Sequence, residues 1–481
     1  MKEGNPVKVN FWSIIFAVFF GNFMAVLSTT TINVALPVFM DEFDAPLDTV
    51  QWMMSGFMLA TGVIAPIIAF VGDRLSYKRL YVYALGGFTL ASLLCVFAWS
   101  IESLIAFRII QGIFSGVMLP TTMTIIYQVI PKEKQAVAIS LWSVSAMLAP
   151  AFGPTIGGWL TESFGWESLF FMNVPIGVIA VVAAQIFIPH YRLSKGVKLD
   201  VIGFAAVIIG TSALLASFSE SHAWGWLNAK TLSLMLLGIA VLIFFVFRTL
   251  RVSAPLLNLR LFKVPRFTYS LILNCAITIS LYAGTFLIPI YMQKIQGSNT
   301  MHTGLIMLPG TVAMAVMSLI MGRLYPKVGP FRLILSGVLL MGAATWALTE
   351  LDLTTGMFFI SAWIAIRYIG IAMCNMPVTN AAMSAIPSEL SGQASAVMNW
   401  IRQGTAALSV SIFSTILSSR TLAHLGEESG SDAQAQTQAL SLSIQELFWI
   451  GTVLVVICIP LTFLLRKKRT EANEAQITAK A

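Results

Sequence analysis

Ionisable side chains are rare in the apolar part of this sequence, and their types restrict the chemistry that it could perform. Only 10% of the 481 residues are charged, whereas 57% are hydrophobic. Three cations, Arg108, Arg367 and Arg402, stand inside apolar runs, and all 21 carboxylates are expected outside the middle of such runs. A cation in that position could orient polar groups or bind an anion. Proton transfer near neutral pH would instead need a group with a shifted pKa.

The groups that could carry or gate a proton therefore lie near the ends of the apolar runs. By elimination, the candidates are Asp73, Glu102, Glu220 and His302. A histidine at the start of a run, such as His302, is more often an exposed loop residue than a proton carrier. Proton coupling is thus an expectation, and facilitated export without it is the alternative.

Uncharged polar side chains inside the apolar runs form a second set of candidates. An unsatisfied polar group is costly in hydrocarbon, so these side chains should turn inward, toward a solute path or toward interhelical hydrogen bonds. Both roles are open for each of them. The substrate-cavity candidates, with one arginine included, are Asn22, Ser28, Asn33, Gln111, Asn274, Tyr282, Asn375, Asn399, Arg402 and Gln403. The 23 methionines and 32 phenylalanines would suit a soft apolar pocket for varied amphiphilic molecules.

Apolar runs of about 20 residues must position these side chains, and each could cross a hydrocarbon layer of about 30 Å as a helix. A membrane β-barrel would show alternating ten-residue segments instead. The sequence therefore predicts an all-α membrane protein with 14 transmembrane helices. The runs lie near Trp12–Leu36, Val50–Val71, Leu80–Trp99, Ser103–Gln128, Val137–Trp159, Leu169–Ile188, Leu199–Phe218, Thr231–Phe247, Phe267–Tyr291, Gly304–Tyr325, Leu333–Leu348, Met357–Ala385, Ala394–Leu417 and Leu447–Leu465.

The distribution of lysine and arginine predicts the orientation. With a cytoplasmic N-terminus, the inner loops and tails hold roughly twenty-three of these residues and the outer loops roughly three. This bias predicts a multi-pass protein of the cell membrane with both termini in the cytoplasm. The net charge of +8 is then a consequence of topology, and a nucleic-acid partner is excluded. The basic cluster at Arg466–Arg469 is expected to contact anionic lipid headgroups.

An internal repeat divides the chain into related halves. FRIIQG at Phe107–Gly112 precedes Pro120 and an Ile-Pro segment, and IRYIG at Ile366–Gly370 precedes Pro377 and a second Ile-Pro segment. Duplicated halves around a central cavity are typical of transporters. We therefore expect a six-helix bundle in residues 1–190, a linker with two inserted transmembrane helices in 191–266, and a six-helix bundle with a cytoplasmic tail in 267–481.

A tight turn between the second and third runs could close the inner face through ion pairs and helix-end contacts. It reads VGDRLSYKRL at Val71–Leu80, with one acidic residue followed by several basic ones. Asp73, Arg74, Lys78 and Arg79 resemble the cytoplasmic-loop motif of the major facilitator superfamily, although other residues fill two of its glycine positions. A degraded copy, GRLYPKVGPFR, occupies the equivalent loop of the second half.

Two further motifs fit the same superfamily. Arg108, Gln111 and Gly112 resemble its buried-arginine motif, which implies that the fixed charge tunes a proton-linked step; the alternative is that Arg108 snorkels to the outer surface. The fifth run, APAFGPTIGGWL, resembles the signature of exporters and antiporters, which implies outward transport. Its glycines would let a neighbouring helix approach closely. The packing residues of this motif are Pro150, Gly153, Pro154, Gly157 and Gly158.

The end of the first run, LSTTTINVALP, resembles the signature of the fourteen-span drug:proton antiporter branch, which includes multidrug and lincomycin-resistance exporters. Many members of that branch carry an aspartate where this chain has Ser28. The aspartate is a plausible proton carrier, so its replacement by a hydroxyl leaves the coupling chemistry open.

The resemblance implies a secondary active exporter of amphiphilic drugs or toxic compounds, driven by the proton gradient without a cofactor and working by a rocker-switch motion of the two halves. The sequence has no Walker-type GxxxxGK[ST] stretch and no HExxH, CxxC or GxSxG motif, so neither a primary pump nor an enzyme is expected. Its partners would be small amphiphilic substrates, protons and membrane lipids. One alternative is an exporter of an endogenous anionic or lipid-like metabolite. Another, of a different class, is a non-transporting membrane sensor or assembly partner.

Overall fold

Every regular element in the described part of the chain is a helix. A computed structural model describes residues 11–64, 67–189, 200–252, 257–386, 390–427 and 433–465. The α-helices are α1 (Phe11–Glu42), α2 (Leu47–Val50), α3 (Trp52–Ile64), α4 (Ile68–Leu75), α5 (Tyr77–Val96), α6 (Ile101–Val129), α7 (Lys132–Phe164), α8 (Ser168–Phe171), α9 (Asn173–Phe187), α10 (Val201–Trp224), α11 (Ala229–Arg251), α12 (Pro265–Ile290), α13 (Thr300–Val328), α14 (Pro330–Ala347), α15 (Met357–Met383), α16 (Ser391–Glu427) and α17 (Ala433–Leu464). Short irregular helices are η2 (Leu259–Lys263), η3 (Tyr291–Ile295) and η4 (Leu348–Glu350).

The predicted all-helical membrane fold is confirmed. Twelve of the described helices are long and apolar enough to cross a membrane. The two other apolar runs of the sequence form the interrupted pair α3–α4 and the long helix α7. The helices thus follow the order of the predicted runs, and the number that cross a bilayer stays a prediction.

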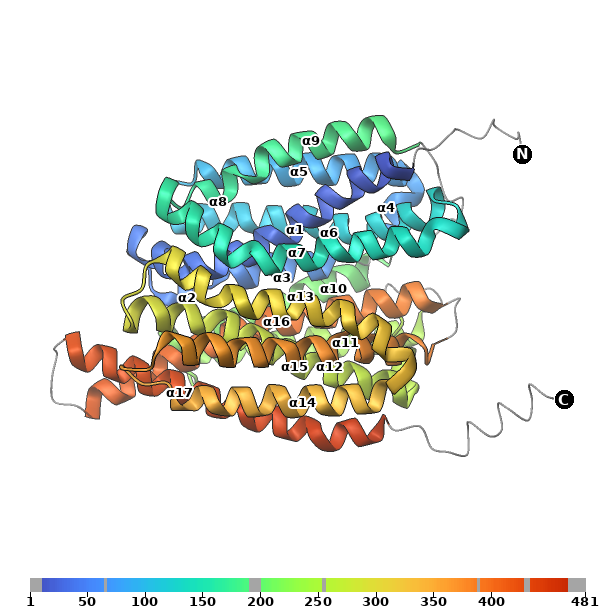
Figure 1. The fold of residues 1–481 in the computed structure, drawn as a ribbon. Coiled ribbons are helices and arrows are strands. Elements are labelled where there is room, and N and C mark those ends of the chain that lie inside the picture. The colour runs from blue at the N-terminus through green and yellow to red at the C-terminus, as the bar shows by residue number, and fades with distance from the viewer. Residues whose placement is uncertain are drawn as a thin grey trace, which may run out of the picture.

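The helices form two bundles that lie side by side (Figure 1). In the first bundle, α1 packs on α7 and α9, and α6 packs on α3 and α5. In the second bundle, α15 packs on α12, α13 and α14, and α17 packs on α14 and α16. Two helix pairs, α7 with α13 and α3 with α16, make the principal contacts between the bundles.

Helix α1 begins and helix α17 ends at the same end of the molecule (Figure 1). We call this the terminal end and the opposite one the far end. At the far end, the last turns of α16 and the first turns of α17 project beyond the other helices (Figure 1).

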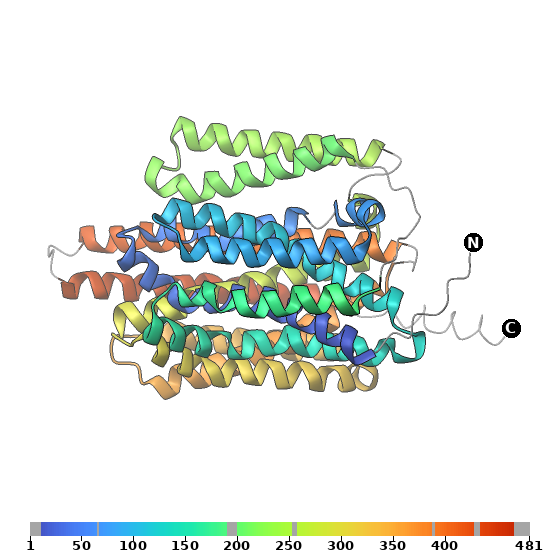
Figure 2. The same ribbon diagram turned by 90° about the horizontal axis from the view of Figure 1, so that it is seen from above.

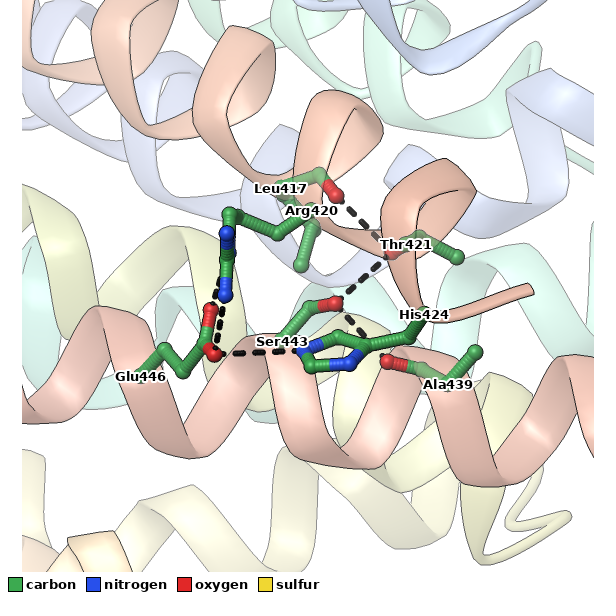
Figure 3. Close-up of polar contacts among 7 residues, drawn as sticks. All are labelled: Leu417, Arg420, Thr421, His424, Ala439, Ser443 and Glu446. Atoms are coloured by element: carbon green, nitrogen blue, oxygen red, sulfur yellow. Dashed lines mark hydrogen bonds and ion pairs between the residues drawn. The ribbon is translucent and has the colours of Figure 1, made fainter. Parts of the chain in front are cut away.

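Polar contacts tie the two projecting helices together (Figure 3). Arg420 donates through Nε and Nη2 to Glu446 Oε2 and Oε1, at 2.5 and 2.6 Å, and His424 Nε2 lies 3.1 Å from the same carboxylate. Beside them, the Thr421 hydroxyl donates to Ser443 Oγ at 3.2 Å. These contacts continue the helix pair past the apolar part of the bundle.

Helices α10 and α11 form a separate hairpin along one face of the molecule (Figure 2). Helix α10 packs on α16 and contacts α2 and α3, whereas α11 packs mainly on α10 and is otherwise largely exposed. At the terminal end, Asp200 Oδ1 accepts hydrogen bonds from Arg248 Nε and Nη2 at 3.0 and 2.8 Å, and from Gly203 N–H at 3.0 Å. One carboxylate therefore caps α10 and holds α11 against it.

The largest apolar cluster that the bundles share lies toward the far end, and a smaller one joins Val63 of α3 to Val397 and Met398 of α16 nearer the terminal end. One cluster of buried residues joins Val34 and Phe39 of α1 to Leu287 of α12 and Met307 of α13. Toward the terminal end, the first bundle has a cluster of its own, which includes Ile14 of α1. Burial of apolar surface therefore holds the two bundles together mainly at the far end.

Candidate functional site

Arg108 is fully buried in the first bundle and joins three of its helices. Its Nε donates to the Met53 carbonyl of α3 at 3.2 Å, and Nη1 donates to Ser28 Oγ of α1 at 3.1 Å and to Gln111 Oε1 at 2.5 Å. The guanidinium carbon also lies 4.1 Å from the centre of the Phe57 ring. The alternative that this arginine snorkels to the surface is therefore wrong, because its hydrogen-bond partners lie inside the bundle.

The polar network of Arg108 extends to a fourth helix. Gln111 Nε2 donates to Ser92 Oγ of α5 at 2.6 Å, so a chain of side chains crosses from α1 through α6 to α5. Apart from the arginine, every described member of this network is an uncharged group. The network can hold helices and orient dipoles, but it contains no carboxylate that could exchange a proton.

Arg367 has the corresponding role in the second bundle. It lies on α15, with 2% of its surface exposed, and its Nε donates to Thr345 Oγ1 of α14 at 3.3 Å. Its Nη2 donates to the carbonyl and the hydroxyl of Ser280 on α12. A Cβ at Gly284 would overlap Nη1, so a larger residue there would force the Arg367 side chain to move. The repeat that the sequence shows around Arg108 and Arg367 thus coincides with two similar buried sites.

Arg402 differs from the other two arginines because it is exposed. Among the described residues, its guanidinium has one hydrogen-bond partner, Asn399 Oδ1 at 3.4 Å, and it lies within electrostatic range of Tyr282 on α12. An arginine that faced lipid in a spanning helix would cost about 2.5–3.5 kcal/mol on insertion scales. We therefore expect its exposed face to contact water rather than lipid.

Other polar candidates on α15 and α16 accompany Arg402. Asn375 is exposed, and Asn399 and Gln403 are half-buried. Gln403 packs closely against Gly62 of α3, where the two bundles meet. These residues lie in the halves of α15 and α16 nearer the terminal end.

The remaining amides have different surroundings. Asn22 is fully buried and donates to Ser145 Oγ and to the Trp142 carbonyl of α7 at 2.5 and 3.2 Å, which makes it an interhelical contact of the first bundle. Asn33 of α1 and Asn274 of α12 are also buried, and their side-chain oxygens, like that of Asn22, have no hydrogen-bond partner among the described residues. They keep acceptor capacity that a substrate or water could use.

The glycines of α7 lie against two different helices. An added Cβ would lie 2.1 Å from Thr30 Oγ1 at Gly153, and 2.8 Å from the Thr31 carbonyl of α1 at Gly157. At Gly158 it would lie 2.4 Å from the Thr300 carbonyl of α13. The motif therefore packs α7 both within its own bundle and against the other one.

The rest of the glycine motif completes the contact between bundles. Gly304 of α13 faces the Pro154 carbonyl, and Thr155 Oγ1 donates to the Gly304 carbonyl at 3.2 Å. The side chain of Pro150 lies outside the described residues.

The charged candidates for gating and coupling lie at the helix ends. The Asp73 side chain is outside the described residues, whereas Arg74 and Arg79 are exposed at the turn between α4 and α5. Ser76 of that turn has a positive φ of 82° and caps α5. Glu102 and His302 are exposed, and Glu220 is half-buried, all toward the far end.

Sequence reasoning missed the polar contacts between the bundles at the far end. Asp48 Oδ1 accepts hydrogen bonds from Ser414 and Ser418 of α16, and Lys294 Nζ lies 2.5 Å from Asp41 Oδ1. Gln293 Nε2 donates to the Val34 carbonyl at 2.6 Å. The acidic loop after α1 was the available signal, but it did not indicate which acid would meet α16.

The chain belongs to the Major Facilitator Superfamily, whose family model matches residues 18–410. The predicted superfamily is thereby confirmed, and with it the expectation of a transporter of small molecules rather than an enzyme.

Three curated relatives cover most of the chain. It is 34% identical to the uncharacterized MFS-type transporter YhcA of Bacillus subtilis, over 89% of this chain and 80% of that protein. It is 27% identical to the lincomycin resistance protein LmrB of Listeria monocytogenes, over 95% of this chain and 97% of that one. It is 29% identical to the colistin resistance protein EmrB of Acinetobacter baumannii, over 86% and 81%.

Solved structures share the fold. A crystal structure of a bacterial homologue of the human lysosomal transporter Spinster, inward-facing and occupied, matches with a TM-score of 0.66 and 16% identity over 96% of this chain and 97% of that one. The nucleoside transporter NupG matches with a TM-score of 0.63 and 11% identity over 95% and 99%.

Proposed function

We propose that the protein is a secondary active exporter of amphiphilic drugs or toxic compounds in the cytoplasmic membrane, with both termini in the cytoplasm. The observation that carries this proposal is the asymmetry of the molecule. The larger of the apolar clusters that the bundles share lies toward the far end, whereas polar side chains such as Asn375 and Arg402 are exposed nearer the terminal end. The lysine and arginine distribution assigns the terminal end to the cytoplasm, and several relatives are named as resistance proteins.

Transport would require the bundles to rock about their two shared interfaces. In the conformation described above, substrate would enter from the terminal end and meet the exposed polar face of α15 and α16. Release on the other side would require the far-end contacts of α7 with α13 to separate while contacts form at the terminal end. Small residues at this interface favour such motion because the backbones approach without interlocked side chains.

Inward proton flow is the proposed energy source. Arg108 donates to Ser28 and Gln111, so the centre of the first bundle orients neutral groups and holds no described carboxylate. The coupling proton is therefore assigned to carboxylates at helix ends, of which Asp73, Glu102 and Glu220 are the candidates. Arg74 and Arg79 would act with Asp73 in closing the terminal end.

Efflux from cells tests this function directly. Cells that express the protein should accumulate less of a fluorescent amphiphilic dye than cells without it, and an uncoupler should remove the difference. In liposomes, adding substrate should change the internal pH, and Asp73→Asn should reduce that change. Dye accumulation that is indifferent to both expression and the proton gradient would contradict the proposal.

An exporter of amphiphilic anions is a second candidate, and the exposure of Arg402 favours it. A charge-assisted hydrogen bond contributes about 1.5–3 kcal/mol, so Arg402→Gln is expected to slow export of an anionic amphiphile at least tenfold. Export of a cationic dye should be unchanged or faster, and Arg402→Lys should restore part of the anion transport. The initial efflux rates of the two probes, measured in the same cells, provide the comparison.

The matched control is Arg251→Gln, which neutralises an exposed arginine at the terminal end of α11. It should leave both rates at the wild-type value. If Arg402→Gln slowed only the cationic dye, anionic cargo would be excluded.

A further inference from the structure

A carboxylate of the first bundle is bound by two hydroxyls of the second bundle at the far end. Asp48 Oδ1 accepts hydrogen bonds from Ser414 Oγ at 3.0 Å and from Ser418 Oγ at 3.2 Å. The two serines are four residues apart on α16, so they lie on one face of that helix. Ser414 is fully buried, and Asp48 is half-buried.

We propose that Asp48, Ser414 and Ser418 form a latch that holds the far end closed and must open in each transport cycle. This inference rests on the proposed alternating-access function and adds to it the residues that set the conformational equilibrium. None of the three was among the candidates that the sequence provides.

The short helix α2 fixes the position of Asp48. Leu47 and Val50 on either side of it are buried in the core that the two bundles share. Gln51 is fully buried, and its Nε2 donates to the Asp48 carbonyl at 3.2 Å. The carboxylate is therefore presented to α16 from a rigid support, which reduces the entropy lost when the latch forms.

The receiving segment of α16 is held on a second side. Thr415, next to Ser414, donates to the Phe218 carbonyl of α10 at 2.9 Å. The latch thus lies where α2, α10 and α16 meet, so the first bundle, the inserted hairpin and the second bundle are joined at one point. Opening the latch would separate α16 from α2, while the Thr415 hydrogen bond still joins α16 to α10.

The ion pair between the bundles at the far end is less suited to this role. Lys294 and Asp41 form an ion pair in which the aspartate side chain is 70% exposed. Exposed ion pairs contribute little because water and salt screen them. The hydrogen bonds between a half-buried carboxylate and two hydroxyl donors are stronger than such an ion pair. Because these donors are neutral, the two bundles can still separate without leaving a buried cation behind.

The distance between the bundles at the far end is the direct test. Spin labels at Phe164→Cys on α7 and at Leu353→Cys before α15 occupy exposed positions on the first and second bundles. Double electron–electron resonance on the full chain in lipid nanodiscs would give the distance distribution, with the chain lacking introduced cysteines as the background. Loss of both hydroxyls, in Ser414→Ala with Ser418→Ala, is expected to raise the far-end-open population about tenfold or more.

A set of variants makes the result specific to the latch. Asp48→Ala should produce the same shift, and combining it with the two serine changes should add nothing further. Asp48→Asn keeps one acceptor oxygen and should give an intermediate shift, which preserves the test if Asp48→Ala does not fold. The control is Ser409→Ala on the same helix, because the Ser409 hydroxyl donates only to the Thr405 carbonyl at 2.7 Å.

The latch proposal would be overturned if the serine and aspartate variants gave the same distance distribution as Ser409→Ala. The readout needs no transport. A distance shift in a protein that moved no drug would therefore support the latch while contradicting the exporter function. Normal efflux without a shift would contradict the latch alone.

Discussion

Replacing Gly158 with leucine is expected to abolish transport while the protein still inserts into the membrane. An ideal Cβ at this position would lie 2.4 Å from the Thr300 carbonyl and 2.9 Å from the Met301 Cα, both backbone atoms of α13. Backbone cannot move aside as a flexible side chain can, so the larger residue would hold α7 and α13 apart at the far end. The initial efflux rate, normalised to the amount of protein in the membrane, should fall at least a hundredfold.

Gly86 provides the matched control. It also lies in a spanning helix, α5, but its added Cβ would meet no atom within 4 Å. Gly86→Leu should therefore keep most of the activity. Gly304→Leu should reproduce the loss, because a Cβ there would lie 2.4 Å from the Pro154 carbonyl on the opposite side of the same contact. Efflux by Gly158→Leu at half the wild-type rate would contradict this account of the interface.

Replacing Arg108 with alanine is expected to remove both stability and transport. The change leaves the Met53 carbonyl, Ser28 and Gln111 without their donor inside the bundle. Hydrogen bonds between membrane helices contribute about 0.6–2 kcal/mol each, so the two to α3 and α1 together correspond to about 1–4 kcal/mol of unfolding free energy. A lower thermal midpoint of the purified protein, with efflux reduced at least a hundredfold, is the expected pair of results.

Two comparisons separate the role of Arg108 from a general effect of charge. Arg108→Lys keeps the charge but cannot reach acceptors on two helices through a planar fork, so we expect partial recovery of stability. Arg402→Gln should leave the thermal midpoint unchanged, because the Arg402 guanidinium is exposed and has one long hydrogen bond. A midpoint of Arg108→Ala equal to that of the wild type would show that the buried network does not stabilise the bundle.

The helices could be predicted from the sequence because run length and apolar composition are local properties. The order of the helices follows the predicted runs, and the glycines of α7 do pack closely, as the motif indicates. The sequence could not assign Gly153 and Gly157 to α1 and Gly158 to α13. That assignment depends on the rotation of α7 about its axis, which is set by the tertiary packing of both bundles.

Dependence on tertiary packing also explains why the sequence could not assign roles to the candidate site residues. Asn22 and Asn375 are both amides in apolar runs, yet the first joins two helices and the second is exposed. Asp48 belongs to a cluster of acids after α1, and only packing against a helix more than 360 residues later distinguishes it from its neighbours. Side-chain type limits which roles are possible, and the helix contacts decide among them.

The projecting ends of α16 and α17 have a practical consequence for work on this protein. Arg420, His424 and Glu446 stiffen the hairpin where it leaves the apolar bundle (Figure 3). In the proposed orientation, this tip stands above the outer leaflet, clear of lipid and detergent. It is therefore a suitable epitope for an antibody fragment, which could report membrane sidedness on intact cells and serve as an alignment marker in electron cryomicroscopy.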